Sequence, residues 1–210
     1  MGPQQWRNLM RRLALYDNLE TYQQLYAAYS QRHRYYHGID HIASCLRELE
    51  STRTVAKYPE QVEIALWFHD AVYTPMALDN EERSAIWATQ FLASADASPD
   101  TCARVQAHIL ATRHNVLPDN PDSALVVDID LAILGQESDI YECFEQTIRA
   151  EYQRVPWPVY RRKRHEILLS FLERDSIYST PCFRERYEAA ARRNMQVAIE
   201  MLESPDEQRN

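Results

Sequence analysis

The stretch EIALWFHDAVY, residues 63–73, is a strongly apolar run, and it carries two adjacent ionisable side chains near its end. Its apolar residues lie on nearly every side of a helix, which is typical of a central helix packed on several sides. His69 and Asp70 then come at the buried carboxyl end of that helix. A buried carboxylate is costly unless it is paired, and the negative end of a helix dipole disfavours it further. A metal ion would compensate, and an arginine or backbone donors are the alternative.

The composition around this run favours helices throughout. The 210 residues include only three glycines, whereas Ala, Leu, Glu, Arg and Gln are plentiful. We expect an all-α, single-domain helical bundle over residues 1–204, with a frayed tail at 205–210. LPDNPDS, residues 117–123, is predicted to be a loop, and residues 124–135 to be a buried helical segment ended by Gly135. The other expected helices are Pro3–Ser30, Ile39–Glu50, Glu60–Asp70, Glu81–Ser94, Asp100–Thr112, Ser138–Gln153, Pro158–Glu173 and Pro181–Glu203.

Charge and cysteine usage narrow the class of partner. A formal net charge of −8 and a pI near 5.4 disfavour polymeric nucleic acid as a ligand. The four cysteines contain no CxxC pair, so we interpret them as buried thiols in a reducing compartment. The chain has no signal-like apolar segment at its start and no run long enough to span a membrane. We therefore expect a soluble cytoplasmic protein that does not bind membranes, and a homo-oligomer is compatible with these features.

Two further segments place ionisable groups among apolar neighbours. In RYYHGIDHIASCLREL, residues 34–49, His41 shares a helix face with Cys45, so its imidazole is directed inward. An inward histidine is more often a hydrogen-bonded core residue than a ligand. In VVDIDLAILG, residues 126–135, Asp128 and Asp130 have almost exclusively apolar neighbours, and two carboxylates there are costly unless paired.

These segments together offer imidazoles and carboxylates from three separate inward-facing elements. Such a mixed donor set suits Mn, Fe, Co, Ni or Zn more than Ca, and Mg is also compatible; either one or two ions would fit. The chain resembles the HD superfamily and, more narrowly, a group of small bacterial predicted metal-dependent phosphohydrolases. The resemblance covers most of the chain and rests on RYYHGIDHI (34–42), ALWFHDAVY (65–73), DNEERSA (79–85), ILATRH (109–114), DIDLAILG (128–135) and the stretch from Glu188 through Arg192 to Asn194.

The resemblance implies a ligand set for the metal. His41, His69, Asp70 and one of the two later aspartates would bind the ion. We favour Asp130, because it stands immediately before the apolar turn LAIL. Asp128 would then orient a ligand or a water, although the order of these two residues could be reversed.

Several other residues are candidates for accessory roles. His108 and His114 lie six apart, so they cannot share an ion on one continuous helix. If the helix stops near Thr112, however, His114 can turn toward the site. His37 is an alternative ligand or a group that orients one. Residues 79–85 are either a capping segment, in which Asp79 or Asn80 accepts amide hydrogen bonds and Glu81 favours the helix N-terminus, or they supply Glu81 as the general base. Arg34 and Arg113 either clamp a phosphate or are solvated.

Open coordination positions on such a centre would support hydrolysis. We expect a metal-dependent phosphohydrolase that attacks a small phosphorylated substrate, with nucleotides among the candidates, by means of a metal-activated water. Two alternatives use the same scaffold: a di-iron oxygenase, and a regulatory HD domain without catalysis. A purely structural helical bundle is a third.

Overall fold

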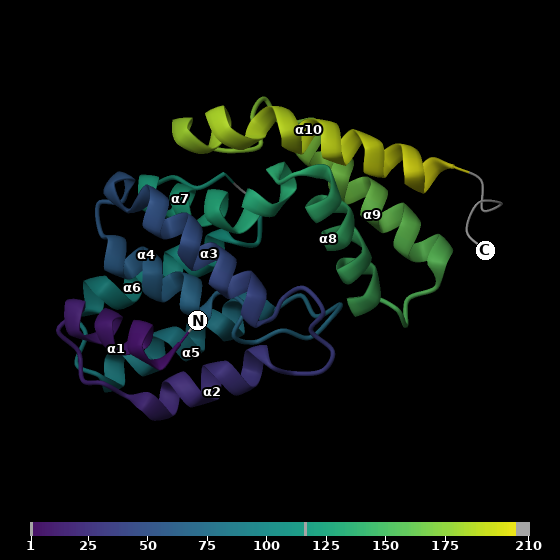
Figure 1. Ribbon diagram of the computed structural model, residues 1–210. Helices are drawn as coiled ribbons and strands as arrows, with labels where there is room; N and C mark the ends of the chain where they lie inside the picture. The colour runs from purple at the N-terminus through teal and green to yellow at the C-terminus, as the bar shows by residue number, and fades with distance from the viewer. Residues whose placement is uncertain (1, 116, 205–210) are drawn as a thin grey trace. The chain divides into compact units, whose positions relative to one another are not determined.

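The computed structural model describes residues 2–115 and 117–204, and the predicted tail at 205–210 lies outside them. Over the described residues the regular secondary structure is all helical and no strand forms, so the predicted all-α class is confirmed (Figure 1). The helices are α1 (Pro3–Arg12), α2 (Leu19–Tyr29), α3 (Ile39–Thr52), η1 (Arg53–Val55), α4 (Pro59–Phe68), α5 (Asn80–Ser94), α6 (Pro99–Ala111), α7 (Pro121–Asp130), η2 (Leu131–Gly135), α8 (Ser138–Glu151), α9 (Trp157–Leu172) and α10 (Pro181–Glu203).

The chain divides into two compact units, Met1–Asp130 and Leu131–Asn210. The first contains α1 to α7, and the second contains η2 and α8 to α10. The expectation that residues 1–204 form one domain stays a prediction. Every residue predicted to bind the metal or the substrate lies in the first unit.

Helix α4 is the centre of the first unit, as its apolar sequence predicts. It contacts α1, α3, α5, α6 and α7 (Figure 1). All its residues from Gln61 to Phe68 are buried. The aromatic rings of Trp67 and Phe68 pack against Trp6 of α1, and Phe68 stacks on Phe91 of α5 with ring centroids 5.7 Å apart. The tight packing around α4 fixes the position of the polar residues that follow it.

The first predicted helix, Pro3–Ser30, is wrong because the chain reverses between α1 and α2. Ala14 adopts a left-handed backbone conformation, with φ of 55°. Asn18 then caps α2 by accepting a hydrogen bond from the amide of Thr21, and its own carbonyl accepts one from Trp6 Nε1. The two helices contact one another. One straight helix could not bury both of their apolar faces in the same core.

Helix α7 begins earlier than predicted, at Pro121. The amide oxygen of Asn120 accepts the backbone N–H of Ser123, and this capping interaction starts the helix inside the expected loop. The expected segment 124–135 is helical, but it changes at Asp130 from an α-helix to the 3-10 helix η2. Asp130 is therefore the last residue of α7, at the point where the helix geometry changes.

Gly135 ends η2, as predicted, and it does so without a left-handed backbone conformation, because no described glycine has a positive φ. A Cβ atom on Gly135 would lie 2.8 Å from the backbone oxygen of Tyr187 in α10. The close approach of the two backbones requires glycine.

The C-terminal part of the family resemblance corresponds to a structural clamp inside the second unit. Glu188 accepts hydrogen bonds from the backbone amides of Ile177 and Tyr178, and Arg192 donates to the carbonyls of residues 172, 174 and 175. Asn194 donates to the carbonyls of residues 134 and 136. Arg192 and Asn194 thereby provide hydrogen-bond donors for the backbone carbonyls at the ends of α9 and η2.

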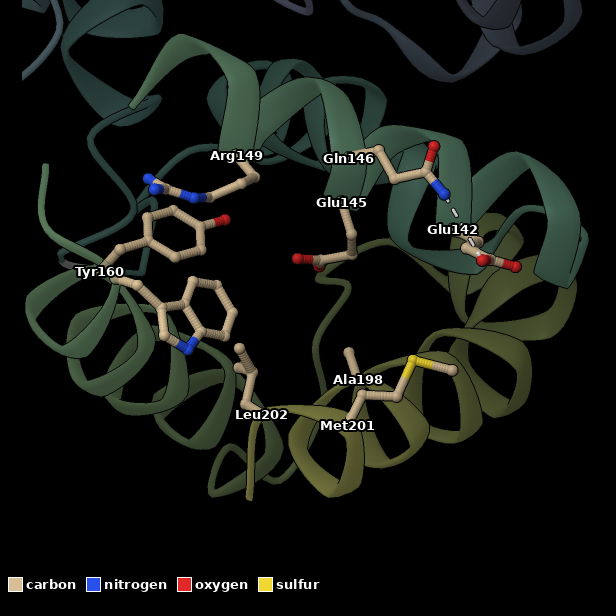
Figure 2. Close-up of a pocket in the computed structure, with 9 residues that line it drawn as sticks. Glu142, Glu145, Gln146, Arg149, Tyr160, Ala198, Met201 and Leu202 are labelled. Atoms are coloured by element: carbon tan, nitrogen blue, oxygen red, sulfur yellow. Dashed lines mark hydrogen bonds between the residues drawn. The ribbon is translucent and has the colours of Figure 1, made fainter. Parts of the chain in front are cut away.

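The second unit also contains a cavity of about 420 Å³ between α8, α9 and α10 (Figure 2). Polar side chains of α8 line one side, and the carboxylate of Glu145 points into the space. Apolar and aromatic side chains of α9 and α10 line the other side. None of the predicted site residues borders this cavity, because all of them lie in the first unit.

Candidate metal centre

His69 and Asp70 leave the end of α4 in the way that the sequence predicts. His69 caps the helix, and its amide donates to the carbonyl of Ala65 at 2.8 Å. The ring of His69 is fixed by its Nδ1, which lies 3.0 Å from the carbonyl of Leu66. A carbonyl can only accept, so Nδ1 carries the proton. The Nε2 atom of His69 is therefore directed away from α4 as a potential ligand.

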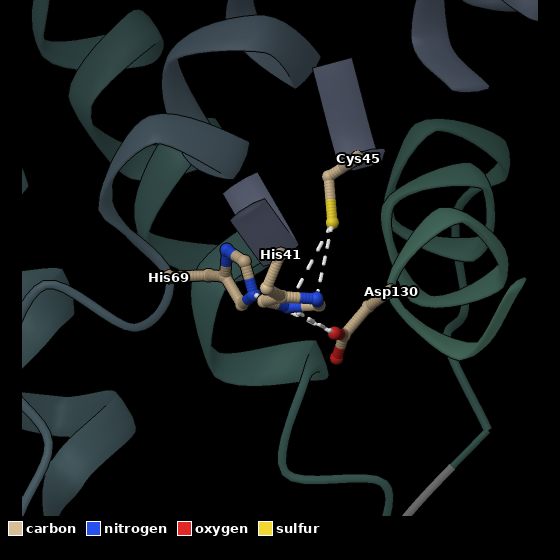
Figure 3. A group of neighbouring side chains, drawn as sticks. All are labelled: His41, Cys45, His69 and Asp130. Carbon is tan, nitrogen blue, oxygen red and sulfur yellow. Dashed lines mark hydrogen bonds and ion pairs between the residues drawn. The ribbon is translucent and has the colours of Figure 1, made fainter. Parts of the chain in front are cut away.

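His41 comes from α3 and meets His69 inside the first unit (Figure 3). The two Nε2 atoms lie 3.2 Å apart, and both histidines are buried. The inward direction predicted for His41 is confirmed. A histidine that only fills the core usually bonds a backbone group, but the described contacts of the His41 ring include no such bond. The ring instead faces another imidazole and two carboxylates.

The two carboxylates are Asp70 and Asp130. Oδ2 of Asp70 lies 3.2 Å from Nε2 of His69 and 3.6 Å from Nε2 of His41. Oδ1 of Asp130, at the end of α7, lies 3.1 Å from Nε2 of His41 and 3.5 Å from Nε2 of His69. Asp128 is fully buried and stands outside the group of potential ligands that contains Asp130. The choice of Asp130 over Asp128 as a ligand stays a prediction.

The spacing of these donor atoms suits a single ion. Ligand atoms bound tetrahedrally at about 2.0–2.1 Å lie about 3.3 Å from one another. The distances between the imidazole nitrogens and the carboxylate oxygens run from 3.1 to 3.6 Å. Each imidazole nitrogen thus lies about as far from both carboxylates as one coordinated ion requires. Asp70 is nevertheless not among the residues His41, Cys45, His69 and Asp130, whose ligand atoms all lie within 4.8 Å of one another.

The charges of the group also call for a cation. Burial by itself lowers the pKa of His69, but Asp70 and Asp130 raise that pKa well above its ordinary value. Burial alone would raise the pKa of Asp70, whereas the neighbouring His69 lowers it below its ordinary value. Burial likewise opposes ionisation of Asp130, but hydrogen bonds from His114, His41 and His69 hold its pKa well below the ordinary range. Positive charge at this point, from a proton or a metal ion, stabilises both carboxylates.

Cys45 is a potential ligand that the sequence analysis did not include. Its Sγ lies 3.7 Å from Nε2 of His41, and the ligand atoms of His41, Cys45, His69 and Asp130 all lie within 4.8 Å of one another (Figure 3). These four residues could hold a metal ion. The spacing of His41 and Cys45, four residues apart on a buried helix face, was the available signal. Cys45 is the one buried cysteine; Cys143 is exposed, so the expectation of four buried thiols is wrong.

His114 turns toward the centre because α6 ends at Ala111, as the sequence analysis anticipated. His114 adopts a left-handed conformation with φ of 58°, and its Nε2 lies 3.0 Å from Oδ2 of Asp130. Asp130 thus presents one oxygen to His114 and the other to His41. This arrangement orients the carboxylate. His108 instead lies beside Ser123 and takes no part in the group.

His37 lies beside the group rather than in it. Its ring stacks on Tyr73 with centroids 4.3 Å apart, and its centroid is 6.1 Å from that of His41. Tyr36 packs edge-on against His37 and lies 4.7 Å from His41. His37 contributes to the lowered pKa of Asp70, after the larger effects of burial and His69. The placement fits a residue that surrounds the ligands better than one that binds the ion.

Arg34 has a structural position that weakens its predicted role in phosphate binding. Its guanidinium donates to the carbonyls of His37, Asp70 and Ala71, and to the side chain of Gln31. Four of its five N–H donors are thereby used. Arg34 ties the segment before α3 to the end of α4, and so holds Asp70 in place through its backbone.

Arg113 follows the end of α6 and lies beside Glu81 and Glu82 at the start of α5. Arg113 forms an ion pair with Glu82, and its Nε lies 4.0 Å from Glu81. Asn80 bonds the backbone of Thr74, and Asp79 makes no side-chain cap, so the expected capping of α5 by these residues is wrong. The roles of Glu81 as general base and Arg113 as phosphate ligand stay predictions.

The two sides of the centre differ in exposure. The side chains of His41 and His69 are 3% and 1% exposed, whereas those of Asp70 and Asp130 are 16% and 13% exposed. The imidazoles lie toward the interior and the carboxylates toward solvent. The carboxylates are therefore the less deeply buried side of the centre.

No family model, curated protein or solved structure matches this chain. Among the described residues, each helix is too short or too polar to cross a membrane.

Proposed function

We propose that the chain is a metal-dependent phosphohydrolase of the HD type. The observation that carries this proposal is the convergence of His41, His69, Asp70 and Asp130 from three elements at distances of 3.1–3.6 Å. These are the four residues that the HD resemblance selects, in the order in which they occur along the chain. The charges and spacing of the donors fit a divalent transition ion.

The coordination chemistry of the four ligands gives the proposed activity its reaction class. A divalent ion in an open site lowers the pKa of a water toward ~7 and polarises a phosphoryl oxygen. Two imidazoles and two carboxylates leave coordination positions for a substrate, unlike a closed structural site. Hydrolysis of a phosphate ester or anhydride is the reaction that best uses both effects.

The residues of the chain have distinct tasks in this proposal. His69 is held by the Leu66 carbonyl and offers Nε2, while His114 holds one oxygen of Asp130 so that the other faces the imidazoles. Asp70 offers an oxygen from the solvent side. Glu81, at the start of α5, is the candidate to accept a proton from the attacking water.

The substrate we propose is a small phosphorylated molecule, with nucleotides among the candidates, in the cytoplasm. The net charge of −8 disfavours a polymeric nucleic acid on electrostatic grounds. One ion satisfies the four ligands described, and His114 beside Asp130 is the residue through which a second ion would be held.

The test combines metal analysis of the purified chain with a phosphatase screen over nucleotides and sugar phosphates. The Asp130→Asn variant should lose its bound metal and lower the hydrolysis rate by about 100-fold or more, since even residues that only orient ligands are worth about 10- to 100-fold in metal affinity or activity. Asp175→Asn, which changes an exposed aspartate of the second unit, is the matched control and should behave like the unaltered chain.

The alternatives give different results in the same experiment. Iron content with oxygen consumption and no phosphate release would identify a di-iron oxygenase and contradict the proposal. Bound metal without turnover of any phosphorylated compound would favour a regulatory domain. An Asp130→Asn variant that keeps both metal and hydrolysis would remove the proposed centre altogether.

A further inference from the structure

We propose that Cys45 is an alternative ligand of the metal centre, and that thiophilic ions such as Zn(II) and Co(II) are bound through Cys45 in place of Asp70. His41, His69 and Asp130 would serve both ligand sets. The inference rests on the metal-binding part of the proposed function and does not depend on phosphate hydrolysis.

The position of the sulfur supports this assignment. Sγ of Cys45 lies 3.7 Å from Nε2 and 3.8 Å from Nδ1 of His41. A thiolate at about 2.3 Å and an imidazole nitrogen at about 2.0–2.1 Å from one tetrahedral ion lie about 3.6 Å apart. Sγ is nearly equidistant from the two nitrogens of the His41 ring, so it faces the ring and must rotate toward the Nε2 lone pair to bind an ion there. The ligand atoms of the group all lie within 4.8 Å of one another.

Cys45 and Asp70 approach the imidazoles from different environments. Cys45 is 2% exposed and lies on the buried face of α3, whereas the side chain of Asp70 is 16% exposed. Cys45 would therefore bind the ion from the interior and Asp70 from the less deeply buried side. The described contacts of the thiol are those with His41, so metal binding would not break a stronger interaction of the sulfur.

The two ligand sets have equal charge and different chemical softness. Each carries two negative charges, from Asp130 and either Asp70 or Cys45, which neutralise a divalent ion. Binding through Cys45 forms one sulfur–metal bond and releases the thiol proton to solvent, with no change of oxidation state. Thiolate ligands select Zn and related ions, whereas carboxylates suit Mg and Mn. The centre would thus accept both kinds of ion by different means.

The first test uses the full chain and one control variant. The full chain, freed of metal and titrated with Co(II) alone, should develop a sulfur-to-cobalt charge-transfer band together with the weaker d–d bands of bound Co(II). A chain in which Cys102, Cys143 and Cys182 are all replaced by Ser should keep the charge-transfer band. Bound Co(II) without that band would overturn the inference.

The second test compares two single variants by metal competition. Cys45→Ser should lower affinity for Zn(II) by about 100-fold or more and leave affinity for Mn(II) within about threefold, since an outer residue alone is worth about 10- to 100-fold. Asp70→Asn should show the opposite preference. Cys143→Ser, at an exposed position, is the matched control.

These measurements separate this inference from the proposed function. If Mn(II) and Zn(II) affinities fall equally in Cys45→Ser while far-ultraviolet circular dichroism is unchanged, Cys45 has no selective role. If the ligand preferences appear but no phosphorylated compound is hydrolysed, the inference stands and the proposed activity fails.

Discussion

His114 shows how a single residue outside the ligand set can shape the centre. Its φ of 58° is costly for a residue other than glycine, and it brings Nε2 to 3.0 Å from Oδ2 of Asp130. Strain of this kind persists where the surrounding structure or function requires it. The contact with Asp130 supplies such a reason, because it fixes which carboxylate oxygen faces the imidazoles.

Replacing His114 by Asn should test this contact without adding backbone strain, since Asn tolerates the left-handed region. We expect metal affinity to fall by about 10- to 100-fold because Asp130 loses its orienting partner. The free energy of unfolding of the metal-free chain should change by less than about 1 kcal/mol. Isothermal titration with Mn(II) measures the first quantity and urea unfolding the second. Unchanged affinity would mean that Asp130 is positioned without His114.

His108 predicts a pH dependence of stability that is separate from the metal centre. The residue is 1% exposed, and its Nε2 has no hydrogen-bond partner among the described residues. Burial lowers its pKa to about 4, against about 6.5 in an unfolded chain. The unfolded state therefore binds the proton first as the pH falls, so the stabilising contribution is complete above pH ~6.5 and is lost below it.

Between about pH 7 and about pH 5, this group alone should reduce the free energy of unfolding by about 2 kcal/mol. The His108→Gln variant should lack that part of the pH dependence, which urea unfolding at the two pH values would reveal. His165→Gln, at a more exposed histidine paired with Glu203, is the control and should follow the unaltered chain. Parallel pH profiles for His108→Gln and the unaltered chain would show that His108 is not held neutral by burial.

Residue-level reasoning from the sequence succeeded where local chemistry decides the outcome. The inward direction of His41 follows from its helical stripe, and the turn at His114 follows from the end of α6. The position of Arg34 could not be predicted, because its partners are backbone carbonyls of a segment more than thirty residues away. The sequence shows that Cys45 shares a helix face with His41. A buried cysteine at that spacing is equally compatible with a small apolar core residue, so its role as a ligand was not predicted.

At the scale of elements, α1 and α4 are held together by a buried ion-pair network. The Glu63 side chain, 2% exposed, pairs with Arg12 of α1 and with Arg53 of η1, the latter at 2.7 Å. Arg53 also binds Glu60 at 2.9 Å. Removing the charge of Glu63 would leave Arg12 and Arg53 with Glu60 as their remaining shared partner.

We expect Glu63→Gln to lower the free energy of unfolding by about 1–3 kcal/mol. This is less than the cost of breaking a fully buried ion pair, because the two guanidinium groups are partly exposed and both still pair with Glu60. Glu50→Gln changes another partner of Arg53 whose side chain is 62% exposed, and should cost less than about 1 kcal/mol. Urea unfolding of both variants gives the comparison. Equal effects at the two positions would contradict the structural role of the network.

The order and type of the elements were largely predictable, and the exceptions have specific causes. The break between α1 and α2 depends on Asn18 and on the contact between the two helices, which a helical pattern alone does not reveal. The switch from α7 to η2 at Asp130 is equally local and gives the metal centre one of its ligands. Gly135 was predicted to end a helix, but its close approach to Tyr187 required the tertiary structure.

At the scale of the whole molecule, the chain concentrates its candidate chemistry in one of its two compact units. The residues that could hold the ion, from His41 to Asp130, all belong to the first unit. The all-α class followed from composition, whereas the division at residues 130 and 131 falls within a continuous helical segment and carried no sequence signal. The second unit has its own cavity and its own clamp of Glu188 and Arg192.

The central claim is that a divalent ion binds between the imidazoles and carboxylates of the first unit. The most direct measurement is an anomalous difference map from crystals of the chain grown with Mn(II) or Zn(II). We predict a peak within about 2.0–2.3 Å of Nε2 of both His41 and His69 and of an oxygen of Asp130. A well-ordered crystal in which the metal binds elsewhere, while these side chains only bond one another, would contradict the central claim.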